Sequence, residues 1–186
     1  RNITPNKFAK FHEHLHQFKG FTYAKKNIRR YPNNGAAHVL GYISEVNNRV
    51  IEASNGYYKP GDYSGTIGLE KAFEEELRGE KGTRYEVVDV FNNVQGSFNN
   101  GAEDIIPISG TDIMSSLSID LQVYGEQLMQ NKRGGIVAIE PNSGEILALV
   151  TTPGYNPNMM VGRQRSKNSV LLFNDTIKNN ILIGKL

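Results

Sequence analysis

The residues with the clearest potential for chemistry near the start of the chain are His12, Glu13 and His16, which fit the His-Glu-x-x-His pattern of zinc hydrolases. On a helix, His12 and His16 would share a face and could bind one zinc ion, with Glu13 as the general base. A catalytic zinc also needs a third ligand, but His14 points away from that edge and His38 lies in a turn-like segment. The sequence therefore favours a solvated helix without a metal, and a zinc hydrolase stays as an alternative.

Composition excludes several classes of protein. The 186 residues carry a formal net charge of +2 with scattered basic side chains, so nothing indicates binding to nucleic acid. The absence of cysteine excludes disulfides and thiolate metal sites, and we expect no cofactor. No apolar run reaches the ~18 residues of a membrane span, and Arg1 does not begin a signal peptide. Because the sequence starts at Arg1 without a methionine, we expect it to be a piece of a longer protein.

The element that organises the chain is predicted between Gly65 and Gly79. Leu69, Phe73 and Leu77 recur every fourth residue, which is typical of the buried stripe of an amphipathic helix. Ser64 or Thr66 is expected to cap its start, and Gly79 its end. Glu70 would lie in the first turn, where the helix dipole favours a carboxylate. The sequence thus predicts one short helix that presents Glu70 near its N-terminus.

The other elements indicate an α+β fold of short helices and antiparallel strands. A helix is predicted from Asn6 to Lys19, and a strand for 21–28. Further strands are expected at 83–90 and 103–108, and another helix begins with Asp120 as its N-cap. The clearest hairpin joins 135–140 to 145–150 through Pro-Asn-Ser-Gly. Because both of its strands are apolar on both faces, they should belong to a larger sheet.

Three phrases of the sequence resemble one family, the class B penicillin-binding proteins. They are Arg-x-Tyr-Pro at 29–32 with Ala-His-Val-Leu-Gly-Tyr at 37–42, Gly-x-x-Gly-Leu-Glu-Lys at 65–71, and Gly-x-Val-Ala-Ile-Glu-Pro at 135–141 followed by Thr-Pro-Gly-Tyr-Asn-Pro-Asn at 152–158. The family usually has Asp at the position of Asn156. The resemblance is to peptidoglycan D,D-transpeptidases of the penicillin-binding protein 2 type, which act in cell elongation and bind penicillin.

This resemblance implies a division of the chain. Residues 1–110 would form the elongated, non-catalytic pedestal (dimerisation-type) domain, and 111–186 the first helix and hairpin of an incomplete transpeptidase domain. The family's catalytic Ser-x-x-Lys has no match here, because no serine is followed by a lysine three residues later, and Lys-Thr-Gly is also absent. We therefore expect this chain to be inactive alone. Because the hairpin lacks the rest of its sheet, we also expect an exposed apolar patch, association in solution, or disorder after about Pro153.

The candidate site is structural rather than catalytic. It comprises Arg30, Tyr31, Gly68, Leu69 and Glu70, which we expect to hold the pedestal together or to its neighbouring domain. Arg30 is predicted to form a bidentate ion pair with Glu70, which would attach the strand to the organising helix. The alternative is that Arg30 is a surface cation stacked on Tyr31.

The resemblance also implies partners and a location. The pedestal would contact a membrane glycan polymerase and a rod-complex scaffold protein, at the periplasmic face of the bacterial inner membrane, with a membrane anchor upstream of Arg1. The exposed hairpin could allow self-association. A free-standing periplasmic interaction module is the other interpretation that stays open.

Overall fold

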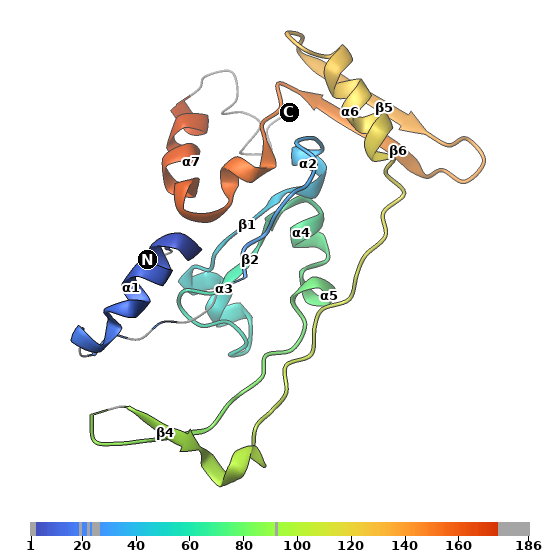
Figure 1. Ribbon diagram of the computed structural model, residues 1–186. Helices are drawn as coiled ribbons and strands as arrows, with labels where there is room; N and C mark the ends of the chain where they lie inside the picture. The colour runs from blue at the N-terminus through green and yellow to red at the C-terminus, as the bar shows by residue number, and fades with distance from the viewer. Residues whose placement is uncertain (1–2, 19, 22, 24–26, 92, 175–186) are drawn as a thin grey trace. The chain divides into compact units, whose positions relative to one another are not determined.

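A computed structural model describes residues 3–18, 20, 21, 23, 27–91 and 93–174 (Figure 1). The chain divides into two compact units, Arg1–Asn27 with Glu75–Asp112, and Ile28–Glu74 with Ile113–Leu186. Both units are therefore built from segments that are distant in sequence. The domain boundary predicted at residue 110 stays a prediction.

The first unit begins with helix α1, Pro5–Glu13, followed by the 3₁₀ helix η1, Leu15–Gln17. Pro5 suits the first helical turn, where its missing N–H would have had no partner. The helix predicted from Asn6 to Lys19 is thus confirmed for its first half and continues as a tighter turn. Most of the strand predicted at 21–28 lies outside the described residues, and its described positions are not in a strand.

The rest of the first unit is an antiparallel pair of strands, β3 (Glu86–Val88) and β4 (Val94–Ser97). The 3₁₀ helix η2, Phe98–Gly101, follows β4. The strand predicted at 83–90 is confirmed in its centre. The returning strand predicted at 103–108 is wrong, because this segment makes only single bridges, Glu80 to Ile108 and Thr83 to Ile105, in the described residues.

The second unit contains helix α2 (Ala37–Leu40), strand β1 (Tyr42–Glu45), helix α3 (Asn48–Ala53), strand β2 (Tyr63–Ile67) and helix α4 (Gly68–Ala72). Strands β1 and β2 pair antiparallel, with Ser44 opposite Ser64. Because β2 leads directly into α4, this pairing places the start of α4 beside β1.

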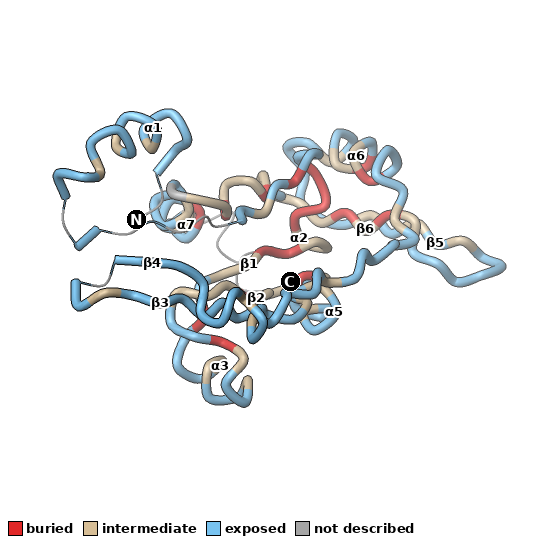
Figure 2. Tube along the Cα trace, turned by 60° about the horizontal axis from the view of Figure 1, so that its bottom comes forward, coloured by how far each residue is buried: buried red, intermediate tan, exposed pale blue. Residues whose placement is uncertain are grey.

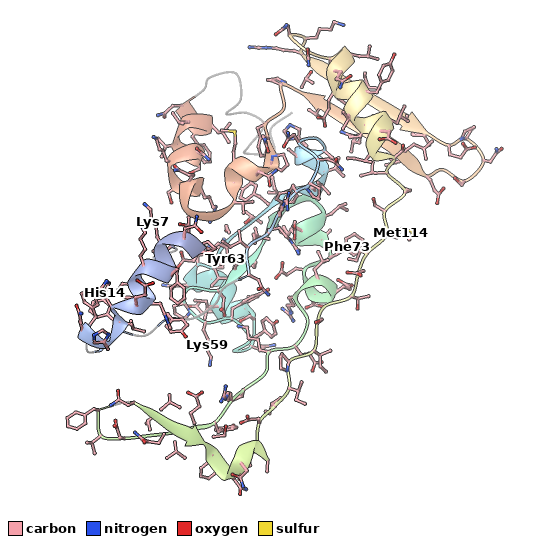
Figure 3. All side chains as sticks on the ribbon, viewed as in Figure 1. Lys7, His14, Lys59, Tyr63, Phe73 and Met114 are labelled. Carbon is pink, nitrogen blue, oxygen red and sulfur yellow. The ribbon has the colours of Figure 1, made fainter. Side chains whose placement is uncertain are left out.

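The prediction of a single helix between Gly65 and Gly79 is wrong about the length of the helix and about its N-terminal cap. Ser64 and Thr66 belong to β2, and α4 starts after Ile67. Phe73, which is labelled in Figure 3, separates α4 from α5 (Glu74–Arg78). Its φ is −114° and its ψ is 30°, and the residue is 37% exposed. The Glu74 carboxylate accepts from the Gly65 amide and the Tyr58 hydroxyl. These contacts favour the break because they direct Glu74 towards β2.

The predicted hairpin is confirmed as β5 (Gly134–Ile139) paired antiparallel with β6 (Ile146–Thr152). Helix α6, Ile119–Leu128, packs on β6 (Figure 1). Its N-cap is Ser118, whose hydroxyl accepts from the Leu121 amide, so the prediction that Asp120 is the cap is wrong. Asp120 lies in the first turn, where its charge is favoured by the helix dipole.

The chain then forms two 3₁₀ helices, η3 (Pro157–Met160) and η4 (Gly162–Gln164), and helix α7 (Arg165–Asn174). Met160 and Leu172 from this segment join Ala37, Tyr42 and Tyr155 in the hydrophobic core of the second unit. The buried parts of the trace lie mainly at α2, at β6 and in the segment after β6 (Figure 2). Residues 157–174 are therefore ordered in helices that pack on the elements around α2.

Candidate functional site

Glu70 lies in the first turn of α4 and is 7% exposed. Gly68 begins this helix in the left-handed region, with φ of +65°, and a Cβ at this position would be 2.5 Å from the carbonyl oxygen of Val39. Glycine is needed here because other residues would be strained and would collide with the α2–β1 turn. The close approach that Gly68 allows places Glu70 beside the segment that precedes α2.

Arg29 forms the ion pair with Glu70. Its Nε donates to Oε1 at 2.7 Å and its Nη2 to Oε2 at 2.6 Å, which is a bidentate contact. The Arg29 side chain is 39% exposed, whereas that of Glu70 is 9% exposed. The hydrogen bond to Glu70 raises the pKa of Arg29 above its ordinary value. The predicted ion pair of Arg30 with Glu70 is therefore wrong, and Arg30 is exposed.

Tyr31 also contacts Glu70, as its hydroxyl donates to Oε1 at 3.1 Å. Burial raises the pKa of Tyr31, and the nearby Glu70 carboxylate raises it further, so the phenol remains a donor. Arg29 and Tyr31 are two residues apart and reach the same carboxylate, as alternate side chains of an extended chain do. This alternation is also the reason why Arg30 does not reach Glu70.

The backbone of Tyr31 is bound by Asn158, which follows β6 in η3. The Tyr31 amide donates to Asn158 Oδ1 at 3.0 Å, and Asn158 Nδ2 donates to the Tyr31 carbonyl oxygen at 2.8 Å. Nearby, Asn156 Nδ2 donates to Asn34 Oδ1 at 3.0 Å. The structure thus brings together parts of all three phrases quoted above: Tyr31 from the first, Glu70 from the second and Asn158 from the third.

A second contact joins the same loop to α6. The Ala36 amide donates to Glu126 Oε1 at 2.6 Å, and Tyr155 Oη donates to the Ala37 carbonyl oxygen at 3.5 Å. A groove of about 950 Å³ lies beside these contacts, and its lining includes Asn34, His38 and Glu126. Both ends of the loop between Tyr31 and Ala37 are consequently held by residues from the later part of the chain.

His38 lies beside this groove with its ring edge-on to Tyr155, at 5.5 Å between centroids. Burial lowers the pKa of His38, against the opposing effects of a hydrogen bond with the Pro153 backbone and of the Glu126 charge. Its Nε2 has no hydrogen-bond partner among the described residues. A neutral imidazole is the form that this environment favours.

The arrangement can position chain segments relative to one another. Glu70 accepts three hydrogen bonds, which leaves it poorly suited to act as a base. Leu69 is half-buried beside it. In the described part of the chain, no group of three or more His, Asp or Glu side chains is placed to hold a metal ion. His12 instead packs against Phe8 and Tyr23, at 5.3 and 5.6 Å between ring centroids.

Comparison with known proteins decides the family. Residues 1–115 match the sequence model of the Penicillin-binding Protein dimerisation domain, which is more than half of the chain. The chain belongs to the penicillin-binding proteins. A peptidoglycan D,D-transpeptidase MrdA from Acinetobacter baumannii is 36% identical over 162 residues, or 86% of this chain. This penicillin-binding protein spans 24% of that relative's length.

Solved structures agree with this assignment. One match is a chain in the complex between penicillin-binding protein 2 (PBP2) and MreC from Helicobacter pylori, with a TM-score of 0.79 and 26% identity. The match covers 96% of the present chain and 33% of the chain in that complex. Another match is a chain in a peptidoglycan synthase complex that coordinates polymerization and crosslinking, with a TM-score of 0.64 and 26% identity. The match covers 92% of the present chain and 32% of the chain in that complex. The predicted resemblance to a class B penicillin-binding protein and the α+β fold are therefore confirmed.

Sequence reasoning missed Arg29, Asn158 and Glu126. Arg29 could have been found, because the Arg-x-Tyr-Pro phrase places its arginine two residues before Tyr31. Asn158 lies in a quoted phrase, but nothing in the sequence indicates that its amide would bind the backbone of Tyr31, 127 residues earlier. Such long-range contacts of side chains with backbone depend on the tertiary fold.

Among the described residues of this penicillin-binding protein, each helix is too short or too polar to span a lipid bilayer.

Proposed function

We propose that residues 1–110 form the pedestal domain of a peptidoglycan D,D-transpeptidase of cell elongation, and that 111–186 form the start of its transpeptidase domain. The observation that carries the proposal is the contact of Tyr31 with both Glu70 and Asn158. It joins phrases of the pedestal to the phrase that opens the transpeptidase domain. The match to the dimerisation domain and the likeness to PBP2 support the same function.

The chemistry would reside in a longer protein. A transpeptidase of this type needs a serine activated by a lysine three residues later, and the 186 residues contain no such pair. We infer that this chain supports the catalytic domain and does not itself form an acyl-enzyme. Arg29, Tyr31, Gly68 and Glu70 would keep the pedestal in a fixed conformation, and Asn158 would attach it to the transpeptidase domain.

Partners and location follow from the same proposal. The H. pylori relative was solved with MreC, and another match belongs to a synthase complex for polymerization and crosslinking. By analogy, the pedestal would bind a rod-complex scaffold protein and a membrane glycan polymerase. We infer from the same analogy that the chain lies at the periplasmic face of the inner membrane, with an anchor upstream of Arg1.

Labelling with a fluorescent penicillin tests the function. The complete gene product should be labelled covalently, and pretreatment with unlabelled penicillin should block the label. The 186-residue chain should remain unlabelled under the same conditions. Labelling of the short chain, or a complete gene product without a Ser-x-x-Lys and without label, would contradict the proposal. A complete gene product that has no Ser-x-x-Lys and takes no label would favour a free-standing interaction module.

A further inference from the structure

Glu126 connects two parts of the second unit that are distant in sequence. Its Oε1 accepts the Ala36 amide at 2.6 Å and also the Gln122 Nε2 at 3.0 Å. A Cβ on Gly35 would lie 2.9 Å from Glu126 Oε2, so the carboxylate directly contacts the backbone of the loop. One carboxylate oxygen therefore joins the loop before α2 to a neighbouring side chain of α6.

Gln122 extends this connection to strand β6. It is 2% exposed, its Nε2 also donates to the Leu149 carbonyl oxygen at 3.0 Å, and its Oε1 accepts the Leu149 amide at 2.8 Å. Both N–H groups and the oxygen of the Gln122 side-chain amide therefore form hydrogen bonds. The neighbours of Leu149 in β6, Ala148 and Val150, are almost completely buried. Gln122 thus fixes α6 on the most buried part of β6.

The loop from Tyr31 to Ala36 is constrained at its two ends. Tyr31 is held by Glu70 and Asn158, as described above. Ala36 has a φ of +59°, a left-handed conformation that is unusual for a residue other than glycine. Such a conformation persists only where the surroundings hold it, and the hydrogen bond of the Ala36 amide to Glu126 is one such contact.

We propose that Glu126 is a positioning residue. It couples two parts of the second unit: the contact that Arg29 and Tyr31 make with Glu70, and strand β6. The path runs from Tyr31 through the loop to the Ala36 amide, and then through Glu126 and Gln122 to Leu149. This inference rests on the proposed function in one respect, that β6 belongs to the start of the transpeptidase domain. Glu126 would then set how the first strands of that domain lie on the pedestal.

Amide hydrogen exchange of the 186-residue chain, followed by NMR, tests this role. In Glu126→Ala, exchange of the Leu149 amide should become about tenfold faster, because Gln122 loses a partner that orients it. In Glu126→Gln, the remaining carbonyl oxygen can still accept both hydrogen bonds, so exchange should stay near that of the unchanged chain. Gln127→Ala, at the exposed neighbouring position of α6, is the matched control and should have no effect at Leu149.

The coupling itself is measured by combining changes at the two ends of the path. Arg29→Met should accelerate exchange of the Leu149 amide about threefold or more when Glu126 is present, and should add little in Glu126→Ala. If Glu126→Ala does not fold, Gly35→Ala replaces it, because its new Cβ would displace the carboxylate without removing a polar group. Gly35→Ala should also accelerate exchange at Leu149.

An unchanged Leu149 amide in Glu126→Ala or Gly35→Ala would overturn the inference. The inference would also be overturned if Arg29→Met and Glu126→Ala changed the exchange rate of the Leu149 amide independently, so that their effects multiplied. Either result would leave the proposed function untouched, since penicillin labelling of the longer protein tests that separately. Conversely, absence of labelling would contradict the transpeptidase assignment but not a measured coupling between Ala36 and Leu149.

Discussion

At the scale of single residues, the site is organised by a carboxylate that is far more buried than its positive partner. Glu70 is 9% exposed at its side chain and Arg29 39%. Burying a charge is costly unless it is paired and hydrogen-bonded, and Glu70 meets both conditions through Arg29 and Tyr31. The stability of the contact should therefore depend more on keeping Glu70 satisfied than on the charge of Arg29.

Replacing Arg29 tests this dependence. Arg29→Ala leaves Glu70 buried without its ion pair, and we expect the free energy of unfolding to fall by about 2–3 kcal/mol. This is less than the ~3–5 kcal/mol for breaking a fully buried pair, because Arg29 is partly solvated. Arg30→Ala is the control and should change stability by about 0.5 kcal/mol or less. Urea unfolding followed by circular dichroism measures both, and equal losses would show that Arg29 has no special role.

His38 should make the stability depend on pH. Burial lowers its pKa in the folded chain below the ordinary value of 6.5. Below pH 6.5 the unfolded chain therefore binds a proton that the folded chain does not, so stability is complete above pH 6.5 and falls as the pH drops towards the lower pKa. In His38→Gln this loss should disappear from the urea midpoint measured between pH 7.5 and 5. An identical pH profile in the two proteins would contradict the assignment.

At the scale of elements, the sequence predicted those whose signals are local. The hairpin of β5 and β6 was predicted because two apolar strands flank a Pro-Asn-Ser-Gly turn. Gly79 was predicted to end the helix, and it follows α5 in a left-handed conformation with φ of +64°. The helix between Gly65 and Gly79 was predicted as one piece because its apolar spacing continues across Phe73. The break depends on contacts of Glu74 with Gly65 and Tyr58, which are tertiary and leave no periodic signal.

Gly68 is an element-level requirement because it joins β2 to α4. Gly68→Ala would force a side chain into the left-handed region and within 2.5 Å of the Val39 carbonyl oxygen. We expect the free energy of unfolding to fall by at least about 2 kcal/mol. Gly154→Ala is the control in the same unit, since its Cβ would make an ordinary contact at 3.8 Å with the Thr151 carbonyl oxygen. Thermal unfolding of the two variants compares them, and equal midpoints would contradict the prediction.

At the scale of the whole molecule, helix α6 covers one face of the β5–β6 hairpin. Ala148 and Val150 are buried on that face, whereas Val137 and Ile139 are 55% and 56% exposed. The sequence predicted an exposed apolar patch because both strands are apolar on both faces, and these exposed fractions confirm it. This chain spans only part of the length of its relatives, 24% and 28% for two of them.

Exposed apolar side chains on a strand favour association, so the 186-residue chain is expected to self-associate through the uncovered face. Val137→Lys places a charge at its centre and should weaken the association constant at least about tenfold, because a buried valine contributes ~1.5 kcal/mol or more. Ser143→Lys, in the turn of the same hairpin, adds the same charge away from this face and should leave association unchanged. Sedimentation velocity over a range of concentrations distinguishes the variants. A chain that stays monomeric throughout would contradict the prediction, and equal weakening in both variants would show that net charge controls association.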